Sequence, residues 1–238
     1  MLAESSHLVY SGGLDPEIHL PSTARSELVE FIAKELPRWR DHPDRPAKQA
    51  ETTLTEHLCD HLNSATYYSE GWSHIQFRAE TGDETKVGRK VDLTPKPRAA
   101  VIIIEGRRHT QFDALFPIEC KRLPTPGEKD RDEREYVITE PGTTGGIQRF
   151  KFGHHGASHK FAAMIAYVQE NDSSHWLAMV NGWINGLSIP PDSPWNQSDE
   201  LQLSNHDPVA RVSALKSRHQ RNEAWGDCEL QHLWIEMN

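Results

Sequence analysis

The fold of this chain is decided by an apolar stretch that ends in charged residues, Leu115-Phe116-Pro117-Ile118-Glu119-Cys120-Lys121-Arg122-Leu123. An apolar run of this length is typical of a largely buried β-strand, which we expect over Asp113 to Leu123. Side chains at positions i and i+2 of a strand project from the same face. We therefore expect Glu119 and Lys121 to project together from the end of this strand.

A second acid stands apart from other acids on a neighbouring strand-like piece. Asp92 is the only acidic residue between Thr85 and Ile104, and it lies in a strand expected over Arg89 to Thr94. Glu84-Thr85-Lys86 repeats the Glu-x-Lys spacing, but in a polar turn that lacks an apolar run. The chemistry is therefore expected at the Glu-x-Lys that follows Ile118.

An aspartate beside a Glu-x-Lys strand can hold a divalent cation next to a phosphodiester. Mg²⁺ binds through a few carboxylates and keeps positions for water and substrate. We expect Asp92 and Glu119 to be ligands, and the Cys120 carbonyl to add a backbone oxygen. Lys121 would orient the attacking water or stabilise the developing negative charge. The pattern predicts the active site of a Mg²⁺-dependent nuclease, with Mn²⁺ as an alternative metal.

The third candidate ligand lies on a helix expected from about Lys48 to Ala65. Glu51 stands near its start, from where it can face the end of the sheet. Glu56 competes with it, and Glu105 and Glu80 are weaker alternatives. We favour Glu51.

Substrate contacts are expected from a stretch without acids. No aspartate or glutamate occurs from Pro141 to Gln169, in a chain of net charge −9. Within it, glycines allow close backbone approach, and Arg149, Lys151 and His154 or His155 can meet phosphates. Phe150 and Phe152 can stack on bases, although core packing is the expected use of at least one.

The remaining patterns predict an α/β fold with a mixed central β-sheet flanked by helices, as a single domain over residues 1–238. Residues 1–24 hold glycines and prolines without periodicity and are expected to form an irregular arm. The expected helices cover Ser26 to Trp39 and Ser158 to Val168, besides the one from Lys48. The other expected strands are Ile75 to Glu80, Ala99 to Ile104, Trp176 to Val180 and Leu230 to Glu236. Pro124 to Gly146 is expected to be a mobile loop that covers the site, and Ile189 to Pro208 a surface excursion.

Composition narrows the class of protein. No apolar stretch approaches the ~20 residues that cross a bilayer, and the start of the chain has no secretory signal pattern, so we expect a cytoplasmic protein without membrane contact. Three widely spaced cysteines, Cys59, Cys120 and Cys228, argue against a disulfide framework or a zinc site. The net charge of −9 argues against a general nucleic-acid coat protein. It leaves room for a local basic cleft, and it favours a second subunit, such as another copy in a homo-oligomer, for tight binding.

These residues together resemble the restriction-endonuclease-like superfamily, also called PD-(D/E)XK nucleases. In that pattern a helix glutamate, a strand aspartate and a Glu-x-Lys surround the metal, and Glu51, Asp92, and Glu119 with Lys121 match it. A later glutamine or basic residue near a helix start often completes such sites, which Gln148 or Arg149 would resemble. The resemblance covers roughly residues 48–168 and departs at Val91, which stands where the name-giving proline would be, and in an extra strand between Asp92 and Glu119.

The resemblance implies a restriction-endonuclease-like core that cleaves DNA. It also implies a role in restriction or anti-phage defence, often beside an ATPase or helicase subunit. In that setting Gln148, Arg149 and Lys151 would contact the substrate or organise the site.

Other functions are also compatible with the sequence. The 14 histidines include His57 and His61 at helical i, i+4 spacing, and His155 and His159 repeat it, but the glutamate of H-E-x-x-H is missing at both places. A non-catalytic scaffold or nucleic-acid-binding subunit with the same fold is the main alternative, and an RNA-directed nuclease is another. Metal binding and cleavage separate these alternatives.

Overall fold

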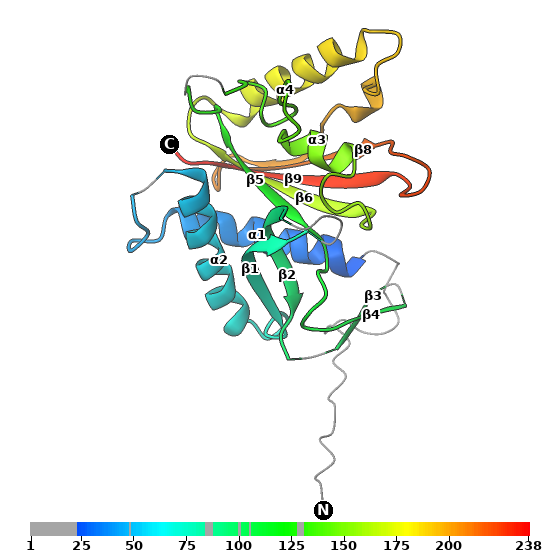
Figure 1. Cartoon of the computed structure of the whole chain (residues 1–238). Coiled ribbons are helices and arrows are strands. Elements are labelled where there is room, and N and C mark those ends of the chain that lie inside the picture. The colour runs from blue at the N-terminus through cyan, green and yellow to red at the C-terminus, as the bar shows by residue number, and fades with distance from the viewer. Residues whose placement is uncertain (1–22, 48, 84–87, 100, 105, 128–130) are drawn as a thin grey trace, which may run out of the picture.

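A computed structural model describes residues 23–47, 49–83, 88–99, 101–104, 106–127 and 131–238 of the chain. The expected arm over residues 1–24 lies almost wholly outside these ranges, as do the Glu84-Thr85-Lys86 repeat and Glu105. The chain forms a mixed α/β fold with a central seven-stranded sheet flanked by helices (Figure 1).

The helices are α1 (Thr23–Arg40), α2 (Glu51–Tyr67), α3 (Gly146–Lys151), α4 (Ser173–Ser188) and the short 3-10 helix η1 (Gln197–Asp199). The strands are β1 (Ile75–Gly82), β2 (Lys90–Pro97), β3 (Ile102–Ile104), β4 (Arg107–His109), β5 (Ile118–Leu123), β6 (Phe161–Val168), β7 (Gln202–Asp207), β8 (Val212–His219) and β9 (Cys228–Glu236).

The central sheet has the strand order β1-β2-β5-β6-β9-β8-β7. β5, β6 and β9 run parallel, and the outer strands pair antiparallel. A parallel strand covered on both faces reads as a continuous apolar run. β6 shows this most clearly, since all of its residues are buried.

Two apolar clusters fill the two faces of the sheet. One joins α1 and α2 to the sheet through residues such as Leu36, Leu58 and Tyr167. The other joins α3 and α4 to the opposite face through residues such as Ile147 and Trp234. Alternate residues of β5 therefore serve different faces: Cys120 belongs to the α1–α2 side, while Glu119 and Lys121 point to the α3–α4 side.

Two predicted elements have the wrong type. The helix expected over Ser158 to Val168 is strand β6, because its apolar residues occupy every position and both faces are covered. The strand expected over Trp176 to Val180 lies inside helix α4. Asp172 caps that helix by accepting a hydrogen bond from the His175 backbone N–H at 2.8 Å.

The strand expected over Ala99 to Ile104 is shorter and lies elsewhere. β3 pairs only with β4, in a separate two-stranded hairpin outside the central sheet. β2 instead pairs directly with β5 and continues through Pro95 and Pro97, where a break is expected from the sequence. Prolines are tolerated here because β2 makes only the Leu93–Ile118 bridge on its β5 side.

The loops also differ from expectation. The described part of Pro124 to Gly145 has no helix or strand, but Tyr136, Val137 and Ile138 are buried and anchor it, so it is not a free lid. The region Ile189 to Pro208 contains η1 and β7, and β8 has no counterpart among the predicted elements. No helix in the described part of the chain is long and apolar enough to cross a bilayer.

Candidate functional site

The candidate site forms where β2 and β5 part. The two strands share the Leu93–Ile118 bridge and then separate. Beyond it the Asp92 carboxylate accepts a hydrogen bond from the Cys120 backbone N–H at 2.8 Å, in place of a strand partner. The N–H and C=O of one strand residue point to the same side. The Cys120 carbonyl therefore faces the same notch as Asp92.

Glu119 and Lys121 meet beside this notch, as strand parity predicts. Lys121 Nζ lies 3.1 Å from Glu119 Oε1, and both side chains are almost fully buried. Burying a charge is unfavourable unless it is paired. A lysine and a glutamate that share one strand face satisfy this condition locally.

Helix α2 brings the third predicted acid to the same place. Glu51 is its first residue, and its carboxylate accepts hydrogen bonds from Lys121 Nζ and from the Arg122 backbone N–H, both at 3.1 Å. Glu56, the competing residue, does not reach Lys121; it lines a small pocket with Glu51, Asp92 and Glu80. Glu51 thus contacts Lys121 directly, whereas Glu56 only lines the nearby pocket.

The acids influence one another's protonation. Burial, together with the nearby Glu119 carboxylate, raises the pKa of Asp92 to about 7, although Lys121 acts in the opposite direction. Burial also acts to raise the pKa of Glu119, but Lys121, His155 and Arg149 outweigh it and hold that pKa at about 2. Burial lowers the pKa of Lys121, and the surrounding carboxylates more than reverse this, so its ammonium stays charged. Asp92 therefore binds a proton more readily than an ordinary aspartate, while Glu119 and Lys121 stay charged.

Helix α3 places Arg149 on Glu119. The Arg149 guanidinium donates a hydrogen bond to Glu119 Oε1, the oxygen that also faces Lys121. Gln148 has a different role in this structure: its side-chain carbonyl accepts hydrogen bonds from the Thr139 and Gly145 backbone N–H groups at 3.2 and 3.1 Å. Gln148 thus organises the turn before α3, whereas Arg149 reaches the acids.

Two further residues join the site. His155 Nδ1 lies 3.3 Å from Glu119 Oε2, yet neither atom has a hydrogen-bond partner among the described residues. Glu135, which the sequence did not single out, places its carboxylate 3.7 Å from Lys121 Nζ and pairs with Arg131 at 2.5 Å. No local pattern marks Glu135, because it comes from an irregular loop. We call the set formed by Asp92, Glu119, Lys121, Glu51, Arg149, His155 and Glu135 the Glu119 cluster.

Lys151, the third predicted substrate contact, lies elsewhere. Its side chain is buried, and Nζ donates to both carboxylate oxygens of Asp199 at 2.9 and 2.8 Å. It therefore points away from the Glu119 cluster and is not presented to a substrate. Lys151 belongs to a buried chain of polar groups that we call the Asp199 network, formed by Lys151, Asp199, His219, Ser217, His232, Tyr136 and Trp234.

The acids of the Glu119 cluster can be compared with what a divalent cation requires. Within the described residues, no group of three or more histidine, cysteine, aspartate or glutamate side chains is placed to share a metal ion. Mg²⁺ in phosphate-handling sites commonly uses one or two carboxylates, completed by water and substrate. Asp92 and Glu119 can provide these two carboxylates, and the buried Glu119 Oε2 makes no hydrogen bond with the described residues, although His155 Nδ1 lies 3.3 Å away. The donor set fits a divalent cation.

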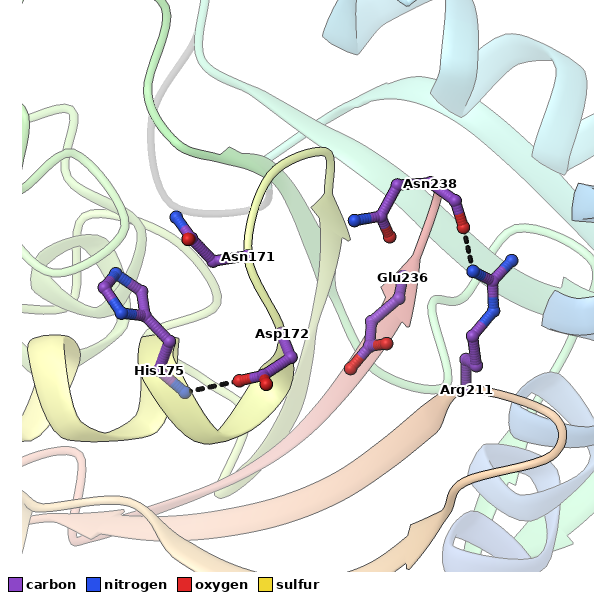
Figure 2. A pocket seen from close by; sticks show the side chains of 6 residues that line it. All are labelled: Asn171, Asp172, His175, Arg211, Glu236 and Asn238. Atoms are coloured by element: carbon purple, nitrogen blue, oxygen red, sulfur yellow. Dashed lines mark hydrogen bonds between the residues drawn. The ribbon is translucent and has the colours of Figure 1, made fainter.

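A second, larger hollow of about 560 Å³ lies where β9 ends and α4 begins (Figure 2). Its charged groups already have partners in the chain. The Glu236 carboxylate accepts from the Ser173 hydroxyl at 2.8 Å, and Arg211 donates to the carbonyl of Asn238. Figure 2 also shows Asp172 turned onto the His175 backbone, as a helix cap. Asp172, Arg211 and Glu236, which line this hollow, are thus used within the fold.

Comparison with known proteins does not extend this picture: no protein-family model, no curated protein and no solved structure matches the chain. The function must therefore be argued from the chain's own geometry.

Proposed function

We propose that this protein is a Mg²⁺-dependent nuclease that cleaves DNA phosphodiester bonds, with Mn²⁺ able to replace Mg²⁺, and that its sheet is a restriction-endonuclease-like core. The observation that supports this most is the convergence of Asp92, Glu119 and Lys121 with Glu51 at the notch between β2 and β5. These residues come from two strands and a helix, and a purely structural ion pair would need only two of them.

The residues have distinct roles in this proposal. Asp92, Glu119 and the Cys120 carbonyl would hold the metal, and a bound Mg²⁺ would supply charge neutralisation on the phosphate and activation of water. Lys121, kept charged by its carboxylate neighbours, orients the attacking water and stabilises charge that develops in the transition state. Glu51 holds Lys121 and the Arg122 backbone N–H in place.

Arg149 links the substrate to the metal site. Its guanidinium covers Glu119, whose side chain is fully buried. Arginine pairs with phosphate as well as with carboxylate. A scissile phosphate bound at the site would compete with Glu119 for Arg149, so that Glu119 would be left free to hold a cation. This exchange couples arrival of the substrate to completion of the metal site.

The cellular setting is part of the proposal. We place the protein in the cytoplasm as a subunit of a restriction or anti-phage defence system, working with an ATPase or helicase partner or as a homo-oligomer. Indiscriminate cleavage would harm the host, and the closed Arg149–Glu119 pair is consistent with activity that waits for a partner or for assembly.

The test is cleavage of plasmid DNA, single-stranded DNA and RNA with Mg²⁺ or Mn²⁺. We expect metal-dependent DNA cleavage that falls by about 10²–10³ in Lys121→Ala, by analogy with the removal of a transition-state-stabilising group, and that is lost in Asp92→Asn. Lys216→Ala, which removes an exposed lysine from β8, is the matched control and should cleave like the wild type. Thermal melts confirm that each variant is folded.

Other outcomes would redirect the proposal. Cleavage of RNA but not DNA would keep the mechanism and change the substrate. Cleavage that survives in both site variants would place the activity elsewhere. Absence of cleavage together with absence of metal binding would favour a non-catalytic scaffold or nucleic-acid-binding subunit.

A further inference from the structure

We propose that the β3–β4 hairpin, with Lys96 and Phe112 at its base, is the surface that holds the duplex DNA flanking the cleaved bond. This inference rests on the proposed function and extends it to substrate binding away from the Glu119 cluster. It also gives a role to the hairpin, which stands apart from the central sheet (Figure 1).

The hairpin exposes positive charge at its tip. Arg107 and Arg108 are both exposed. Their cross-strand partners are Ile104, which is buried, and Ile103, which is 57% exposed. Since paired residues of an antiparallel ladder share a face, the two arginines lie on opposite faces of the ribbon. A two-stranded ribbon fits the major groove of DNA, and a cation on each face can reach the phosphates on either side.

Lys96, at the base of the hairpin, lies on the same strand as Asp92 of the candidate site. Asp92, Thr94 and Lys96 alternate along β2 and share one face. At about 3.3 Å per residue, Lys96 lies roughly 13 Å from Asp92 along the strand, the length of about four base pairs of duplex. Thr94, Lys96 and Phe112 line one pocket, which joins β2 to the segment that follows the hairpin.

Phe112 completes the path with an exposed aromatic ring. Its side chain is 79% exposed, although a phenyl ring is usually buried in a folded protein. Lys96 Nζ donates to the Phe112 carbonyl at 3.4 Å, which connects the lysine to the backbone of this residue. An exposed ring next to cations suits contact with a nucleotide base or sugar.

The charge of the segment around the hairpin indicates which kind of partner it binds. The stretch from Pro95 to Phe112 holds Lys96, Arg98, Arg107 and Arg108 against one acid, Glu105, in a chain of net charge −9. Arg98 is used within the fold, since it donates to the Ile75 carbonyl at 3.2 Å. The nearby Asp113 carboxylate accepts from the Thr110 hydroxyl at 2.7 Å. The cations left for a partner suit a polyanion, which for a nuclease is its own substrate.

The experiment measures duplex binding without metal, so that no cleavage occurs. Fluorescence anisotropy with a duplex of about 30 base pairs gives the dissociation constant across a salt series. We expect Arg107→Ala/Arg108→Ala to weaken binding about tenfold or more and to reduce the slope of log K against log salt by roughly 1.8, the loss of two phosphate contacts. Phe112→Ala should weaken binding with little change in slope. The charge-matched control, Lys216→Ala/Arg218→Ala on β8, should leave the slope unchanged.

The outcomes separate this proposal from the nuclease itself. An unchanged slope in the hairpin variant, or an equal loss in the β8 control, overturns the docking surface, while metal-dependent cleavage can still stand. Failure of the wild type to bind any duplex also overturns the docking surface. The nuclease proposal fails only if cleavage and metal binding are missing as well.

Discussion

Two buried charge clusters lie on the α3–α4 face of the same sheet, and they differ in how completely their polar atoms are paired. Both place a lysine against carboxylates: Lys151 against Asp199, and Lys121 against Glu119 and Glu51. Their lysines are buried to a similar degree. Burial alone therefore does not distinguish a structural cluster from a functional one.

The Asp199 network can be satisfied by one assignment of protons. His219 Nδ1 donates to Asp199 at 2.7 Å, and His219 Nε2 accepts from Ser217 at 2.7 Å. Ser217 in turn accepts from His232 at 2.8 Å, and His232 accepts from Tyr136 at 2.7 Å. Trp234 ends the chain by donating to the Tyr136 oxygen at 2.8 Å.

The contacts Asp199–His219–Ser217 have the order of a catalytic triad, but the chemistry is that of a closed network. Asp199 and His219 are 0% exposed and Ser217 is 5% exposed, which leaves no access for a substrate. Burial lowers the pKa of His219, against the effect of Asp199, and lowers that of His232, so both rings stay neutral. This network locks α3 and the Tyr136 loop to the sheet.

The polar atoms of the Glu119 cluster are not all paired with one another in this way. Glu119 Oε2 and His155 Nδ1 lie 3.3 Å apart and make no hydrogen bond within the described part of the chain, and the pKa of Asp92 is raised to about 7. Unsatisfied polar atoms and perturbed acids gather where proteins bind ligands or do chemistry. The comparison therefore supports a structural role for the Asp199 network and the functional role proposed for the Glu119 cluster.

The largest effect is expected from breaking the closed network. Asp199→Ala leaves the buried Lys151 ammonium without its partner and should destabilise the fold by about 3–5 kcal/mol. Urea denaturation followed by circular dichroism measures this change. The double variant Asp199→Leu/Lys151→Met removes both charges and should recover part of the loss. A single variant as stable as the wild type would show that the network is not structural.

A smaller effect of opposite sign is expected in the Glu119 cluster. Asp92→Asn keeps an acceptor for the Cys120 N–H and removes a crowded charge, so it should stabilise the fold by about 1–3 kcal/mol at pH 8. Urea denaturation in metal-free buffer measures it. Destabilisation by Asp92→Asn would mean that the acids are balanced and that the comparison fails.

The pH dependence of that difference follows from the raised pKa of Asp92. The folded protein binds the Asp92 proton more tightly than the unfolded chain, whose ordinary value is 3.8. The contribution of Asp92 to stability is therefore fully present below pH 3.8 and is lost as the pH rises toward 7. Glu119, with its pKa at about 2, contributes stability that is lost only as the pH falls below its ordinary value of 4.5. Between pH 4.5 and 7 the advantage of Asp92→Asn should grow with pH, and a constant difference would contradict this account.

The smallest effect compares two glutamates on one helix. Glu51→Gln removes the charge that holds Lys121, whereas Glu56→Gln changes a residue that only lines the nearby pocket. Supporting residues of this kind change metal affinity by about 10–100-fold. We expect a loss of about tenfold in Mn²⁺ affinity for Glu51→Gln and little change for Glu56→Gln, measured by calorimetry. The reverse order would transfer the helix role to Glu56.

The gathering of the acids could be predicted from the sequence because it depends on local rules. Strand parity places Glu119 beside Lys121, and an acid at the first turn of a helix places Glu51. The Leu93–Ile118 bridge joins β2 directly to β5, so the extra strand expected between Asp92 and Glu119 does not separate them in the sheet. That strand lies in the β3–β4 hairpin, a pairing that depends on contacts distant in sequence.

Other features could not be predicted for physical reasons. The apolar run in β6 fits a buried strand and a buried helix equally well, and its position between two covered faces decides the matter. Lys151 has the composition of a phosphate contact, but its partner Asp199 is 48 residues away and only the fold brings them together. Glu135 enters the site from a loop without a pattern.

The most direct test of the central claim is a calorimetric titration of Mn²⁺ into the wild type and into Asp92→Asn, beside Glu56→Gln as a folded control. The account predicts a saturable site in the wild type and in Glu56→Gln that is lost in Asp92→Asn. Equal binding by all three proteins, or no saturable binding by the wild type, would contradict it.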